Sequence, residues 1–310
     1  MTRSRKALSG REIEAEIRHF AAFGDAYRDF LARFDKERIF IEEPPEDSCG
    51  SVAAHLLEGR YLLHAFYYQL EIKACEKAVF ELLELLGRRL PVRKENLGRI
   101  QSVFSSGKLD PREFVVTVFR NRGDRFLNVV REQGLEEDLA TFFAVYLTRL
   151  FRVKACRHLC EDIGYFDFED WRKGYCPACG HWPALAHVDP GNEKRTLWCL
   201  NCGTVWPFGR LGCVYCLNQE QGRMDLIGPP GASSPRIQVC HDCREYLKEV
   251  HSPIPAERFP FDAYFLGTHP LDLFARGQGF VHESLLAFEA DDTSREAQLL
   301  SHRMRLPWDH

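Results

Sequence analysis

Hydrophobic residues recur every three or four positions along much of the first half of the chain, as they do on the buried face of a helix. This spacing predicts one helix over residues 11–34 and another over residues 136–160. Residues 61–86 are apolar on most sides, which predicts a central helix that ends at Gly87. Residues 42–50 contain two adjacent prolines and a final glycine, so they predict a connection between elements.

The short apolar run at residues 114–119 fits two structures. Asp110, Pro111 and Glu113 precede it, and they supply the capping side chain, first-turn proline and reciprocal carboxylate of a helix start. A strand is equally consistent with six residues, because periodicity does not separate the two at this length. The sequence therefore leaves both alternatives open here.

The pattern changes near Trp171, after which glycine, proline and paired cysteines break the chain into short segments. We place the main boundary at residues 165–172. We expect a helical domain over residues 1–170, a first cysteine-rich ribbon over 171–210, and a second ribbon with the C-terminal tail over 211–310. The predicted fold class is α+β and multidomain, with a mainly helical N-terminal domain followed by two tandem zinc-ribbon-like four-cysteine modules.

Four Cys-x-x-Cys pairs lie between residues 176 and 243, and they form two similar halves. The first two pairs enclose 19 residues and the last two enclose 23, with room for the extra length in the loop 228–235. Each pair can form a tight turn, here called a knuckle, that points two thiolates at one ion. The eight predicted ligands are Cys176, Cys179, Cys199, Cys202, Cys213, Cys216, Cys240 and Cys243.

Two pairings of the knuckles are possible. Sequential pairing joins the first knuckle to the second and the third to the fourth, whereas interleaved pairing joins the first to the third. The similar length of the two halves favours sequential pairing, and so two metal ions per chain. Four thiolates suit zinc or iron, and the spacing does not choose between them.

The residue after each knuckle differs between the halves. Gly180 and Gly203 follow the first two knuckles, where glycine tolerates a positive φ, but Leu217 and Arg244 follow the other two. We therefore expect a different knuckle geometry in the second site and earlier release of its metal. We also expect metal binding to stabilise each ribbon while the helical half folds without it.

Composition supplies the context for these cysteines. The 310 residues are 45% hydrophobic and 28% charged, which is typical of a folded chain, and the net charge of −4 argues against nucleic acid as a partner. The longest apolar runs without charge are ten residues, too short for membrane insertion, and the N-terminus lacks the apolar block of a signal peptide. We expect a cytoplasmic protein, in which clustered thiols hold metal more often than they form disulfides.

Other candidate residues carry weaker signals. Cys156 and Cys160, with His158 between them, are expected to form a small buried face, with a third metal site or redox pair as the alternative. We expect Cys49 and Cys75 to be structural. Four histidines near the knuckles are expected outside the ligand sets: His181, His187, His241 and His251. The chain has none of the common catalytic motifs, so we predict no catalytic residues and no enzyme activity.

The segments CPACG, RTLWCLNCGTVW, RLGCVYC and RIQVCHDCREYLK, after a helical first half, resemble the formate dehydrogenase accessory protein family, FdhE. The resemblance implies a cytoplasmic protein that is needed for active formate dehydrogenase and that binds the enzyme's catalytic subunit. It also implies rubredoxin-like iron in both four-cysteine modules. Two alternatives remain at this point: a zinc-ribbon nucleic-acid-binding protein and a rubredoxin-like electron-transfer protein.

Overall fold

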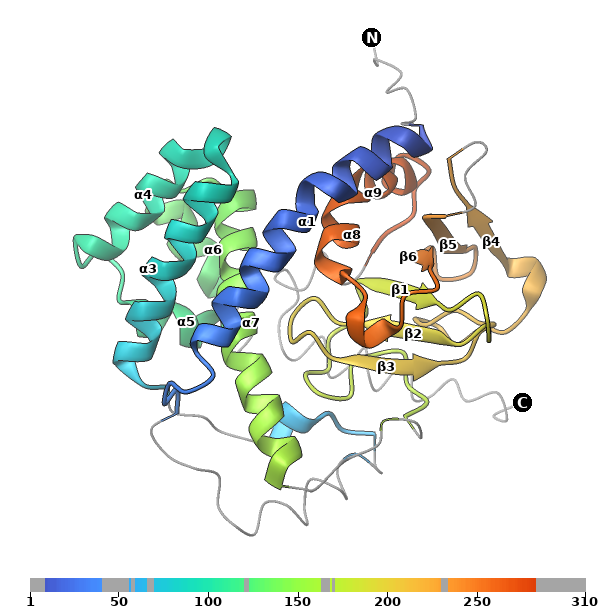
Figure 1. Cartoon of the computed structure of the whole chain (residues 1–310), viewed down its shortest axis with the longest axis horizontal. Helices are drawn as coiled ribbons and strands as arrows, with labels where there is room; N and C mark the ends of the chain where they lie inside the picture. Colours follow the sequence, from blue (N-terminus) through green and yellow to red (C-terminus); the bar gives the residue numbers. More distant parts are fainter. Residues whose placement is uncertain are drawn as a thin grey trace.

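The structure is a computed structural model that describes residues 9–40, 56, 59–65, 70–119, 123–162, 168, 171–229 and 234–282. A bundle of helices lies on one side of the molecule and a six-stranded sheet on the other (Figure 1). Helix α1 runs between the two parts, and α7 extends from the bundle toward the sheet (Figure 1). The predicted α+β architecture, helices first and a cysteine-rich sheet after them, is confirmed.

The helices of the first half follow the hydrophobic pattern. The predicted helix 11–34 is α1, and its start is fixed by a capping box between Ser9 and Glu12. The run 114–119 is helical, since the Asp110 carboxylate accepts a hydrogen bond from the Glu113 backbone N–H at 2.7 Å. The predicted helix 136–160 is α7. The α-helices described in this half are α1 (Gly10–Arg33), α3 (Ile72–Arg89), α4 (Lys94–Ser105), α5 (Pro111–Phe119), α6 (Gly123–Glu132) and α7 (Glu137–Asp162).

The predicted helix over residues 61–86 is wrong at both ends. Leu62–Ala65 is a short 3₁₀ turn, and the α-helix begins only at Ile72, where the Glu71 carboxylate caps two backbone N–H groups. The earlier segment is held elsewhere, because the N–H groups of Leu62 and Leu63 donate to carbonyls of the first knuckle, each at 2.9 Å. At the other end the helix passes through Gly87 and continues to Arg89. The predicted connection 42–50 lies outside the described residues, as does Cys49.

The two cysteine-rich halves form a single sheet. Its strands are β1 (Leu185–Val188), β2 (Arg195–Trp198), β3 (Val205–Phe208), β4 (Met224–Ile227), β5 (Arg236–Cys240) and β6 (Tyr246–His251). In each half a knuckle precedes two strands and a second knuckle precedes the third, so the repeat seen in the sequence is a structural repeat. The strand order is β3-β2-β1-β6-β5-β4. The halves meet where β1 pairs with β6 in parallel, with Ala186 opposite Glu249.

Two short C-terminal helices cover one face of this sheet. They are α8 (Phe261–Gly267) and α9 (His269–Gly277). Phe261 stacks on Trp198 of β2 with ring centroids 5.3 Å apart, and α8 also packs against α1. The approach to α1 is close, because a Cβ at Gly267 would lie 2.5 Å from the Ile17 backbone. One cluster of buried side chains consequently runs from the helical bundle through the sheet to α8.

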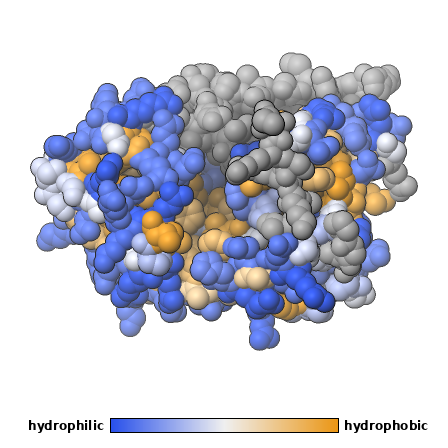
Figure 2. All heavy atoms as spheres, turned by 90° about the horizontal axis from the view of Figure 1, so that it is seen from above, coloured by the Kyte–Doolittle hydropathy of each residue, from blue (hydrophilic) through white to orange (hydrophobic). Residues whose placement is uncertain are grey.

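Hydrophilic residues cover most of the face shown in Figure 2, and hydrophobic atoms are visible in a hollow between its two sides. None of the described helices combines the length and the hydrophobicity that a membrane span requires.

Candidate metal centres

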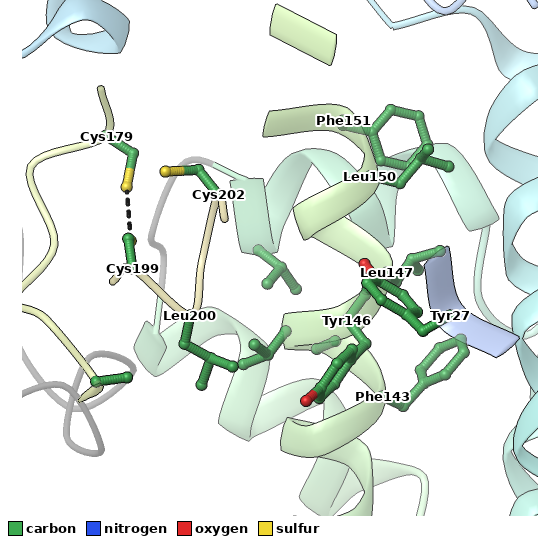
Figure 3. Close-up of a cluster of buried hydrophobic side chains, with 14 of the residues drawn as sticks. Tyr27, Phe143, Tyr146, Leu147, Leu150, Phe151, Cys179, Cys199, Leu200 and Cys202 are labelled. Atoms are coloured by element: carbon green, nitrogen blue, oxygen red, sulfur yellow. Dashed lines mark hydrogen bonds between the residues drawn. The ribbon is translucent and has the colours of Figure 1, made fainter. Parts of the chain in front are cut away.

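The first four-cysteine cluster is formed by two knuckles that lie at the same end of the sheet. The Sγ atoms of Cys176 and Cys202 are 3.5 Å apart, and those of Cys179 and Cys199 are 3.4 Å apart. All four sulfurs lie within 4.8 Å of one another. Figure 3 shows three of these cysteines beside α7, with the Cys179–Cys199 contact as a dashed line.

The second cluster repeats this arrangement. Its Sγ atoms are separated by 3.6 Å between Cys213 and Cys243 and by 3.7 Å between Cys216 and Cys240. The structure thus gathers the eight cysteines in sequential sets, first knuckle with second and third with fourth, and not in interleaved sets. None of the eight is in a disulfide.

The sulfur positions fit tetrahedral metal coordination. A metal–sulfur distance of about 2.3 Å places the sulfurs of a regular tetrahedron about 3.8 Å apart, close to the contacts in both clusters and far from a disulfide bond of about 2.0 Å. Burial raises the pKa of the Cys176 and Cys179 thiols well above the usual value. Four thiolates therefore need a cation to coexist here, and an all-sulfur donor set suits zinc or iron.

All four knuckles share one backbone geometry. In each, the N–H of the first cysteine donates to the carbonyl five residues later, and the residue after the second cysteine donates back to the first. That last residue has a positive φ in every case: 74° at Gly180, 73° at Gly203, 60° at Leu217 and 65° at Arg244. The expectation of a different geometry in the second site is wrong. The knuckle hydrogen bonds hold Leu217 and Arg244 in the left-handed conformation at a cost of about 1 kcal/mol or more each.

The two clusters differ in exposure. All four cysteines of the first cluster are buried, whereas Cys216 and Cys243 of the second are partly exposed. The first cluster is covered by the helical half, since the Tyr61 ring packs directly against Gly180. A side chain at this position would clash, because its Cβ would lie 2.4 Å from the ring. The Arg244 side chain at the second cluster instead lies over the Phe280 ring, with the guanidinium carbon 4.2 Å from the centroid.

Two arginines beside the first cluster were missed in the sequence. Arg149 and Arg152 of α7 are 6% and 2% exposed, and both contact the second knuckle or the residue that follows it. They lie 47 to 50 residues before the knuckle, so no spacing motif connects them with its cysteines. The available signal was their position inside a long helix whose hydrophobic residues lie on most of its sides, so that charged residues within it are buried with them.

The remaining candidates lie outside the two clusters. Cys75 is buried in the helical core, and the side chains of His158 and Cys160 are outside the described part of the chain. Cys156 is buried, and its side chain lies close to that of Cys202. The four histidines have other contacts: His181 with the Cys179 carbonyl, His187 with Phe259, His241 with Asp225 and His251 with Glu249.

The second centre is expected to release its metal before the first, for two reasons. Its knuckles contain the two strained residues Leu217 and Arg244, and two of its sulfurs are accessible to a chelator. Zinc-loaded protein should lose metal in two phases under excess chelator, with timed alkylation and peptide mapping identifying the cysteines released in each phase. Leu217→Gly should slow the first phase several-fold, since about 1 kcal/mol of strain is removed. Alkylation of Cys176 before Cys216 would contradict this order.

Comparisons with known proteins agree with the resemblance seen in the sequence. No protein-family model matches the chain. A curated protein of Aquifex aeolicus (strain VF5), named Protein FdhE homolog, is 30% identical over 154 residues, covering 48% of this chain and 52% of that protein. This chain thus spans about half the length of the curated relative it matches. The crystal structure of the FdhE protein from Pseudomonas aeruginosa matches with a TM-score of 0.52 and 14% identity, over 88% of this chain and 92% of that chain. The resemblance to the FdhE family is confirmed in sequence by the first protein and in fold by the second.

Proposed function

We propose that this chain, which resembles the FdhE family in sequence and in fold, is an accessory protein required for active formate dehydrogenase. The observation that carries the proposal is the 30% identity to a curated FdhE homolog, together with a shared fold that covers most of the chain. The role is maturation and not catalysis, because closed four-sulfur sites leave no open coordination position for a substrate.

The proposal includes two metal ions per chain, with iron favoured and zinc as the alternative. The spacing of the sulfurs and the absence of disulfides among them support metal binding, and the resemblance to FdhE supports iron. The proposed ligands are Cys176, Cys179, Cys199 and Cys202 in the first centre, and Cys213, Cys216, Cys240 and Cys243 in the second. When bound, such an ion supplies a structural cross-link and, if it is iron, a one-electron couple.

The proposed partner is the catalytic subunit of formate dehydrogenase, which the protein binds in the cytoplasm before or during maturation. The test is a pull-down of that subunit with three forms of the protein: anaerobic and metal-loaded, oxidised and metal-free, and metal-loaded Cys213→Ser/Cys216→Ser. Thiolate sites lose their metal as the sulfurs oxidise, so we expect strong capture by the first form and weaker capture by the second.

Each outcome of the pull-down decides a separate part of the proposal. Capture by no form would refute the catalytic subunit as partner. Equal capture by all three would retain the partner and reduce the metals to structural elements. Metal-free protein reloaded with zinc serves as the control, because recovered capture excludes irreversible oxidation damage as the cause of weak binding.

One observation favours electron transfer as a second candidate function. Cys216 and Cys243 are partly exposed, so an iron ion in the second centre would lie close to the surface, as electron transfer to a partner requires. Anaerobic redox titration of iron-loaded protein tests this. A reversible couple that persists in Cys176→Ser/Cys179→Ser and disappears in Cys213→Ser/Cys216→Ser would support the second candidate.

A further inference from the structure

One face of helix α7 lies against the second knuckle of the first centre. Arg149, Arg152 and Cys156 follow one another at steps of three and four residues, so they share this face. The knuckle itself is Cys199–Cys202, and Figure 3 shows its residues beside α7. At the second cluster, the described contact of Arg244 is instead with Phe280 of the C-terminal segment.

Arg149 packs against both sides of this knuckle. A Cβ at Gly203, directly after the knuckle, would lie 3.3 Å from Arg149 Nη2. The guanidinium carbon also lies 5.1 Å from the ring centroid of Trp198, the residue directly before the knuckle. Asp262 of α8 holds the group in place through a 2.6 Å hydrogen bond from Nη1, while the buried Nε–H has no hydrogen-bond partner among the described residues.

Arg152 and Cys156 contact residues inside the knuckle. Arg152 Nη1 donates to the side-chain oxygen of Asn201 at 3.4 Å, and the same guanidinium donates to the Val118 carbonyl at 3.1 Å in α5. The Cys156 side chain lies close to that of Cys202. Helix α7 therefore joins the knuckle to the helical bundle at three successive positions.

The charge of a filled centre explains why cations are needed here. Four thiolates around a divalent ion leave a net charge of −2, and a buried charge is costly unless opposite charge lies near it. Water can offset this charge at the second cluster, where Cys216 and Cys243 are partly exposed. The first cluster is buried, and the guanidinium groups of Arg149 and Arg152 contact its second knuckle. Asp262 balances the charge of Arg149, so we assign the offset to Arg152.

We propose that Arg149 and Arg152 are positioning residues of the first metal centre: both fix its second knuckle from the helical half, and Arg152 also offsets its negative charge. The proposal rests on the metal occupancy proposed above for the first cluster. In this arrangement the first centre is completed by α7, whereas the second lies beside β2, whose Arg195 donates to the Gly212 carbonyl next to Cys213 at 3.3 Å.

The test measures zinc release from each centre separately, by chelator competition with timed alkylation and peptide mapping of the cysteines. Three variants are compared. Arg152→Met removes one guanidinium, and the double variant Arg149→Met/Asp262→Asn removes the other without leaving an unpaired carboxylate. Asn201→Ala removes the contact with Arg152 from the knuckle side. Loss of an outer contact of this kind typically weakens metal binding about 10-fold or more, so release from the first centre should accelerate by that factor. Arg157→Met is the matched control on the same helix, because Arg157 pairs with Asp35 and is about half exposed.

The outcomes separate the proposal from its alternatives. Unchanged release from the first centre in folded variants would overturn it, and equal acceleration at both centres would show general destabilisation instead. A first cluster that takes up no metal in the wild type would refute the proposed occupancy and not the role of the arginines. A charge readout comes from iron loaded into the first centre of Cys213→Ser/Cys216→Ser. Its reduction potential should fall in Arg152→Met and be retained in Arg152→Lys, because a nearby cation stabilises the more negative, reduced state.

Discussion

Loss of the first metal centre is expected to unfold part of the helical half together with the first ribbon. In Cys199→Ser/Cys202→Ser the second knuckle loses its ion, and Arg149 and Arg152 lose the knuckle that they contact. The first knuckle also accepts backbone hydrogen bonds from Leu62 and Leu63. Structural metal sites contribute about 10 kcal/mol or more to folding, which is comparable to the whole stability of a domain. The variant should lose helical circular dichroism at temperatures where the wild type is folded.

The matched control is Cys213→Ser/Cys216→Ser, which removes the equivalent knuckle of the second centre. Since the helical half makes its knuckle contacts at the first cluster, α7 should keep its hydrogen-exchange protection in this control and lose it in Cys199→Ser/Cys202→Ser. The sequence predicts instead that the helical half folds without the metals. Full hydrogen-exchange protection of α7 in both variants would support the prediction from the sequence and show that the helical half folds independently of the metal centres.

The parts predicted correctly from the sequence depend on local signals. Helix α1 follows from a regular apolar stripe, and both four-cysteine clusters follow from short spacings that bring thiols together. The structural repeat also follows, because each half has the same order of knuckles and strands. The division at residues 170 and 210 stays a prediction.

The parts that were missed depend on contacts between distant segments. Pairing of β1 with β6 joins strands about 60 residues apart, and no periodicity specifies such a partner. The start of α3 at Ile72 depends on the first knuckle, which holds Leu62 and Leu63 outside the helix. The positive φ at Leu217 is imposed by the hydrogen bonds of its knuckle against its own preference. Tertiary contacts override local propensity at Leu62 and Leu63. At Leu217 the short-range hydrogen bonds of the knuckle do so.

The interface between β6 and the C-terminal helices contains a buried ion pair, and its disruption should also lower the stability of the protein strongly. Lys248 Nζ donates to the Asp272 carboxylate of α9 at 2.8 Å, and the two side chains are 0% and 3% exposed. The Tyr246 hydroxyl donates to the other carboxylate oxygen at 2.9 Å. Lys248 also donates to the Phe265 carbonyl of α8, so one ammonium holds both helices on the sheet.

Removing one partner of this pair should cost about 3–5 kcal/mol in the free energy of unfolding, because the other charge is left buried. Lys248→Met and Asp272→Asn should each show this loss in denaturant unfolding, whereas Lys248→Met/Asp272→Leu should recover most of it, since neither charge remains. The pH dependence adds a second check. Burial alone would raise the pKa of Asp272, but the Lys248 ammonium holds that pKa below its usual value of 3.8. The ionised carboxylate therefore stabilises the wild type above about pH 4, and this stabilisation is lost as the pH falls further. Without Lys248 the Asp272 carboxyl is protonated at higher pH. The difference in the free energy of unfolding between wild type and Lys248→Met should therefore become smaller as the pH approaches 4. A double variant as unstable as Lys248→Met would show that packing, and not the unpaired charge, accounts for the loss.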